Sequence, residues 1–120
     1  MEEEKRMRQK LKAENYLDKK PLHLEMLKWS AEDGKVTLEI ENKGMWNRLA
    51  QKLLKKPKIS YIHLDEMGSF IWPLIDGDKT VAKIGEAVEE HFGEKASPLY
   101  DRLVRYFQIL ESYRFITWRD

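Results

Sequence analysis

Alternation of apolar and polar residues predicts the strands of this chain. Residues 36–41 alternate strictly, with Val36, Leu38 and Ile40 on one side, as expected for a strand with one buried and one wet face. The preceding Asp33-Gly34 pair is a turn signal. Residues 59–64 follow Pro57 and are predicted as a second strand, with Ser60, Ile62 and Leu64 on one face and Ile59, Tyr61 and His63 on the other. The apolar stretch 22–29 is predicted to pair as a first strand.

Apolar residues at helical spacing predict helices in the second half of the chain. Asp65 and Thr80 are residue types that cap helix N-termini, and Gly77 is suited to ending a helix. Pro73 lacks a backbone N–H donor and should kink or tighten the first helix. The helices are expected at 65–75, 80–92 and 97–113, with Pro98 in the first turn of the last, and a short strand at 115–118.

These elements predict an α+β fold, with a small antiparallel three-stranded sheet followed by three helices, similar to a winged helix-turn-helix. A further helix is predicted as an insertion near residues 44–56, where Trp46, Leu49 and Leu53 recur at helical spacing. Residues 1–20 mix acids and bases with few apolar positions, and we expect a flexible charged arm there, followed by one domain at 21–120. The alternative is that this arm docks on a partner enzyme.

The last predicted helix has an apolar stripe wider than one core contact needs. Two interpretations follow: both flanks of the stripe are buried within the domain, or one flank lines a groove. The stripe is centred on Leu99, Leu103 and Leu110, with Tyr100, Val104 and Phe107 on one flank and Tyr106, Ile109 and Tyr113 on the other.

Small motifs follow one another in a distinctive order between residues 64 and 116. They are Leu64-Asp65, Gly68, Ile71-Trp72, Leu74-Ile75-Asp76-Gly77, Thr80-Val81 and Ile84, then Leu103, Tyr106, Phe107, Leu110 and Phe115-Ile116. Their order and spacing resemble the PqqD family of coenzyme PQQ synthesis and the related leader-recognition domains of ribosomally made, modified peptides. The chain departs from the family at Pro73 and at Arg114, where a glycine usually ends the last helix in a left-handed turn.

The resemblance implies a non-catalytic peptide chaperone. It would bind the leader of a precursor peptide as an added strand and present it to a modifying enzyme, often a radical-SAM protein. The edge of the 59–64 strand would supply backbone hydrogen bonds, and the last helix would supply selectivity. The predicted peptide-binding residues are Ile59, Ser60, Tyr61, Ile62, His63, Tyr100, Leu103, Val104 and Phe107.

Composition and residue spacing argue against several kinds of catalytic and metal-binding site. The 120 residues carry a net charge of +1 and no cysteine, so thiolate metal sites, iron–sulfur clusters and cysteine nucleophiles are excluded. The histidines are scattered without metal-ligand spacing, and Asp76-Gly77-Asp78 is better interpreted as a turn than as a calcium loop. We therefore expect no catalytic residues, no metal and no cofactor. The charged N-terminus and the lack of a long apolar run predict a cytoplasmic protein that does not bind membranes.

Local charge supports a rival hypothesis, a winged-helix DNA-binding protein, although the apolar last helix makes nucleic acid an unlikely partner. A third hypothesis keeps the fold in a scaffold for another modified-peptide system, a transporter or a regulator. The protein is expected to be a monomer or a dimer paired through a strand edge. The local excess of positive charge comprises Lys43, Arg48, Lys52, Lys55, Lys56 and Lys58.

Overall fold

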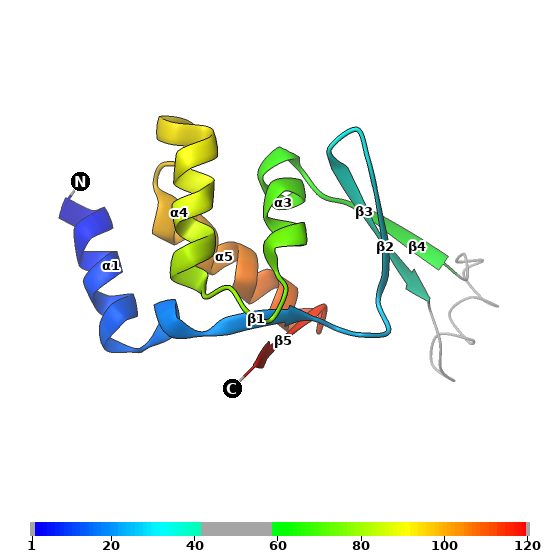
Figure 1. Cartoon of the computed structure of the whole chain (residues 1–120), viewed down its shortest axis with the longest axis horizontal. Helices are drawn as coiled ribbons and strands as arrows, with labels where there is room; N and C mark the ends of the chain where they lie inside the picture. Colours follow the sequence, from blue (N-terminus) through cyan, green and yellow to red (C-terminus); the bar gives the residue numbers. More distant parts are fainter. Residues whose placement is uncertain (1, 42–58, 120) are drawn as a thin grey trace, which may run out of the picture. The chain divides into compact units, whose positions relative to one another are not determined.

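A computed structural model describes residues 2–41 and 59–119 (Figure 1). Its contacts divide the chain into two compact units, one made of Met1–Glu25 with Phe70–Asp120 and the other of Met26–Ser69. The fold is α+β with a three-stranded antiparallel sheet and several helices, as predicted. The inserted helix expected near residues 44–56 lies outside the described residues.

The unit Met26–Ser69 is built on the predicted sheet. Its strands are β2 (Lys28–Glu32), β3 (Lys35–Glu41) and β4 (Ile59–His63), which are antiparallel in the order β2-β3-β4. Asp33 and Gly34 have φ of 53° and 77° in the two-residue turn that joins β2 to β3. Both residue types tolerate positive φ, so the predicted Asp-Gly turn is confirmed.

The prediction of one strand over residues 22–29 was wrong. β1 (Lys20–His23) pairs with β5 (Ile116–Arg119), and the next strand, β2, starts only at Lys28. Residues 24–27 carry no strand because the chain turns there between two different pairing partners. The short strand predicted at the end of the chain is confirmed by β5, which lies beside β1 (Figure 1).

The Ser69 side chain links strand β3 to Leu64, the residue that follows β4. Its hydroxyl accepts a hydrogen bond from Val36 N at 2.9 Å and donates one to Leu64 O at 3.2 Å. Val36 and Leu38 are buried beside it, so the alternation along β3 does mark one buried face. Because the buried Ser69 hydroxyl both donates and accepts a hydrogen bond, its burial leaves no polar atom unpaired.

The helix signals at Asp65, Pro73 and Thr80 are confirmed, whereas Pro98, predicted in the first turn of the last helix, lies at the N-cap just before it. Asp65 caps α3 (Glu66–Ile71) by accepting from Gly68 N at 2.7 Å. Pro73 tightens the continuation into a 3-10 helix, η2 (Trp72–Leu74). Thr80 caps α4 (Val81–Phe92) by accepting from Lys83 N at 3.1 Å.

The second unit combines the chain's N-terminal and C-terminal parts. α1 (Glu2–Ala13), η1 (Tyr16–Asp18) and η3 (Gly93–Ala96) accompany α4 and α5 (Leu99–Ser112), and Figure 1 shows α1 beside the α4–α5 pair. The largest fully buried side chains of this unit are Trp72, Phe107, Ile71, Ile75, Ile84, Leu103, Val81, Val88 and Pro21.

The N-terminal segment expected to be a charged arm forms a helix that packs on α5. Leu11 of α1 is buried, and Glu4 Oε1 accepts a hydrogen bond from Tyr100 N at 2.8 Å. Pro98, the residue at the N-cap of α5, provides no side-chain cap. Glu4 therefore caps α5 from another helix. Its negative charge also interacts favourably with the positive end of the α5 helix dipole.

Replacing Glu4 by alanine should lower the free energy of unfolding by about 1 kcal/mol, the usual cost of losing a helix cap. Urea denaturation followed by circular dichroism measures this loss. Glu3→Ala is the matched control, since Glu3 lies in the same turn of α1 but is exposed. Equal losses in the two variants would contradict a capping role for Glu4.

Arg114 ends α5 in a left-handed turn although it is not glycine. Its φ is 62°, its N–H donates to Glu111 O, and Phe115 N–H donates to Leu110 O, both at 2.9 Å. These are the two hydrogen bonds of a Schellman motif, and the burial of Leu110 and Phe115 completes its apolar contact. The α5 helix thus ends in the left-handed turn at which the PqqD family usually has glycine.

Arg114→Gly should raise the free energy of unfolding by about 0.5–1 kcal/mol, because glycine adopts positive φ without the strain of a Cβ atom. Arg105→Gly is the control, since Arg105 is exposed in the middle of α5. It should lower stability by about 1 kcal/mol. A loss of stability in both variants would show that Arg114 makes a contact worth more than its strain.

Candidate functional site

The edge of β4 that faces away from β3 is the first candidate for binding. Residues of an antiparallel strand alternately direct their N–H and C=O groups to one side and the other. Val36 O accepts from Leu64 N at 2.9 Å, so Ile62 and Ser60, two and four residues before Leu64, also bond to β3. The remaining residues of β4 direct their N–H and C=O groups away from β3: Ile59, Tyr61 and His63.

Within the described part of the sheet, β3 is the only strand that pairs with β4. Tyr61 is 57% exposed and Ile59 is 38% exposed, whereas Ser60 and Ile62 on the opposite face are half-buried. The two faces predicted from the sequence are thus confirmed. β4 presents an edge of backbone groups flanked by an exposed apolar pair.

His63 closes this surface at the end of β4. Its Nδ1 lies 3.0 Å from Thr37 Oγ1 of β3, the residue opposite it in register. The contact fixes the imidazole on the same face as Tyr61. His63 is an exposed member of the sheet face and meets no cluster of metal ligands among the described residues.

The helix residues predicted to bind peptide belong to the other unit. Leu103, Val104 and Phe107 are at most 8% exposed, and Tyr100 is half-buried. α1 packs on α5 and caps it at Tyr100, as described above. The opposite flank of the stripe is the open one, with two exposed residues, Ile109 at 49% and Tyr113 at 64%.

The basic cluster that supports DNA binding falls outside the described residues, since all its members lie between residues 43 and 58. On α5, Arg102 Nη1 donates to Lys95 O at 2.6 Å. That guanidinium therefore already has a partner in its own unit.

An aromatic cluster joins η1 to β5 in a way that the sequence did not reveal. The Lys19 ammonium lies 5.4 Å from the Tyr16 ring centroid and 5.2 Å from that of Trp118. Trp118 donates its indole N–H to Glu111. Burial, and then the negative charge of Glu111, raise the pKa of Tyr16 to about 12, so its hydroxyl stays protonated.

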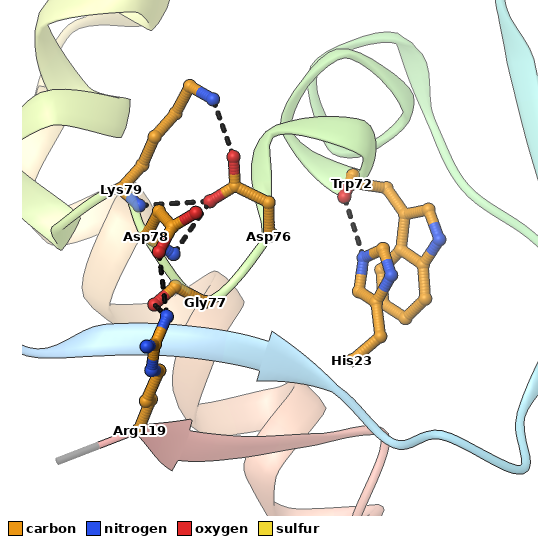
Figure 2. Close-up of polar contacts among 7 residues, drawn as sticks. All are labelled: His23, Trp72, Asp76, Gly77, Asp78, Lys79 and Arg119. Carbon is orange, nitrogen blue, oxygen red and sulfur yellow. Dashed lines mark hydrogen bonds and ion pairs between the residues drawn. The ribbon is translucent and has the colours of Figure 1, made fainter.

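The Asp76-Gly77-Asp78 segment is a turn, as predicted (Figure 2). Asp76 Oδ1 accepts from Asp78 N and Lys79 N, both at 2.9 Å, and Oδ2 accepts from Lys79 Nζ at 2.7 Å. The Lys79 ammonium, followed by these backbone donors, lowers the pKa of Asp76. Arg119 of β5 donates to Gly77 O at 3.1 Å and to Asp78 Oδ1 at 2.7 Å, which fastens the turn to the β1–β5 pair.

His23 makes a second contact that sequence reasoning missed. Its ring stacks on the buried Trp72 at 3.9 Å between centroids, with 11° between the planes (Figure 2). Nε2 lies 2.7 Å from Trp72 O and donates to it, because a carbonyl oxygen only accepts. Burial lowers the pKa of His23 despite opposing contributions from that hydrogen bond and from Asp76.

The lowered pKa of His23 predicts a pH dependence of stability. The unfolded state binds a proton more readily than the folded state, so stability should fall as pH drops through about 6.5, the ordinary value. His23→Gln should reduce this loss between pH 7.5 and 5.5. Urea denaturation of both proteins at the two pH values measures it, and identical losses would contradict the contribution of His23.

A model of a known protein family matches this chain. A model described as coenzyme PQQ synthesis protein D (PqqD) matches residues 36–116, which is more than half of the chain. The chain belongs to the PqqD family. Searches of curated proteins and of solved structures gave no match. The PqqD match starts in β3 and ends in β5, so it includes β4 and leaves α1 outside.

Membership of the PqqD family supports an accessory role in the biosynthesis of coenzyme PQQ or of another ribosomally made, modified peptide. Proteins of this family assist a catalyst instead of being one. No helix within residues 2–41 and 59–119 is long and apolar enough to cross a bilayer.

Proposed function

We propose that this PqqD-family protein binds the leader of a ribosomally made precursor peptide as a strand added to the edge of β4. The single observation that carries the proposal is the outward direction of the backbone groups of Ile59, Tyr61 and His63. Family membership supports the peptide as the ligand. An extended peptide would satisfy these groups with main-chain hydrogen bonds.

The composition of β4 favours strand addition. Edge strands are commonly protected by lysine, proline or inward-pointing charge, and the sequence Ile-Ser-Tyr-Ile-His has none of these. The exposed Tyr61 and Ile59 side chains would contact every second residue of the added strand. Affinity would come chiefly from the backbone, so leaders of different sequence could share the edge.

The α5 residues predicted from the sequence belong to the other unit, and their role as selectivity determinants stays a prediction. Because Leu103 and Phe107 are fully buried, substituting them would report on folding before it reports on binding. A decisive test therefore uses β4, where the side chains are accessible.

Catalysis would belong to a separate modifying enzyme, such as a radical-SAM protein, to which the bound precursor is presented. This chain has no cysteine and so cannot hold the cluster that such chemistry needs. We expect the complex to form in the cytoplasm, where the precursor leaves the ribosome. A binding step separated from chemistry needs only modest affinity, because the product must be released.

Tyr61→Pro should weaken leader binding at least about tenfold, because it removes an N–H that faces the free edge and leaves the bonds of Ser60 and Ile62 to β3 in place. Calorimetry with a candidate leader peptide measures the affinity. Tyr61→Val is the matched control, since it removes the ring but keeps the N–H. Proline at Ser60 or Ile62 would instead disrupt the β3–β4 ladder itself.

Thermal unfolding checks that each variant remains folded. Equal affinities of the proline and valine variants would exclude backbone pairing at this edge. Binding of a random DNA duplex that weakens steeply with salt, without any peptide binding, would replace the proposal by the winged-helix DNA-binding alternative.

A further inference from the structure

β2 forms the other edge of the three-stranded sheet. In the part of the chain that the structure describes, β3 is the only strand that pairs with β2, and every residue of β2 is exposed. Glu32 pairs with Lys35 across the two-residue turn, which makes this pair hydrogen-bonded in a tight hairpin. By alternation, Ser30 and Lys28 also bond to β3.

The backbone N–H and C=O groups of Ala31 do not face β3. Its partner in register is Val36, whose carbonyl accepts from Leu64 N on the opposite side of β3. The N–H and C=O groups of Ala31 are therefore directed away from β3, toward the outer edge of β2.

The sequence of β2 is complementary to itself. Read as Lys28-Trp29-Ser30-Ala31-Glu32, it places a base and an acid at equal distances from a central serine. If two copies pair antiparallel about Ser30, Lys28 of each lies opposite Glu32 of the other. We propose that β2 is the interface for a second copy of this chain, paired edge to edge in the Ser30-centred register.

Both ion pairs of this interface would lie on one face of the sheet, because Lys28, Ser30 and Glu32 alternate with the residues between them. Lys28 contacts Glu41 at 3.9 Å, with side chains 72% and 41% exposed, a loose contact that leaves the ammonium largely in solvent. On the other face, Ala31 would lie opposite Trp29 of the second copy. Opposite charges directly across a strand pair stabilise the pairing, and like charges weaken it.

The β4 edge lacks this pattern. A second copy paired about Tyr61 would place Ile59 opposite His63, with no complementary charge to fix the register. Pairing through β2 would give a six-stranded sheet in the order β4-β3-β2-β2-β3-β4 with both β4 edges still open. The inference therefore agrees with peptide binding at β4 but does not rest on it.

The dimer should be weak, because an edge of five residues buries far less than the roughly 1,600 Å² of a standard stable interface. It should be present at about 1 mM protein and dissociate on dilution. Sedimentation velocity of the full chain from about 10 μM to 1 mM at low salt measures the dissociation constant.

Charge reversal tests the register. Lys28→Glu and Glu32→Lys should each weaken the dimer at least about tenfold, since each places like charges opposite each other twice. The double variant carrying both changes restores complementarity and should return the dissociation constant to within about threefold of the original. The matched control is Lys83→Glu with Glu86→Lys, an exposed pair 4.0 Å apart on α4, whose exchange should leave the dimer unchanged.

Ala31→Pro should abolish the dimer, because it removes an outward N–H without removing a bond to β3. Unfolding curves check that each hairpin survives. A wild-type protein that is monomeric at 1 mM would overturn the proposal, as would a double variant that does not recover. A dimer that survives Ala31→Pro but is lost in Tyr61→Pro would place the interface at β4 and also overturn it.

Discussion

The alternating hydrogen-bond ladder of β3 is the constraint on which both edges of the three-stranded sheet depend. β3 pairs on both sides, and the bond from Leu64 N to Val36 O fixes which of its residues face β4. Once that parity is set, the outward backbone groups of both edge strands follow without further freedom. A slip of one residue would exchange the buried Leu38 with polar Glu39, so burial protects the parity.

The other unit shows how a helix is held when its own sequence provides no cap. Pro98 offers α5 no side-chain acceptor, and Glu4 supplies one from 96 positions away. The same N-terminal segment continues through Lys19, which lies against the Tyr16 and Trp118 rings. The segment lies before the PqqD match, so α5 of this family member relies on residues that the family model does not include.

The features predicted correctly from the sequence are those that depend on interactions between neighbouring residues. The Asp-Gly turn, the caps at Asp65 and Thr80 and the tightening at Pro73 each depend on residues within a few positions, and all were predicted. The pairing of β1 with β5 and the capping by Glu4 join residues about a hundred positions apart, and no periodicity encodes them. The helical wheel gave the width of the α5 stripe, but only packing reveals that Ile109 and Tyr113 lie on the open flank.

The two edges of one sheet differ in chemistry, and that difference argues for different partners. An edge that recognises leaders of varied sequence benefits from uncharged neighbours, because the backbone is common to every peptide, and β4 has this composition. Charges on an edge exclude most strands and fix the register of the few that match. β2 carries such charges in a self-complementary order, which is the observation behind the proposed pairing of two copies.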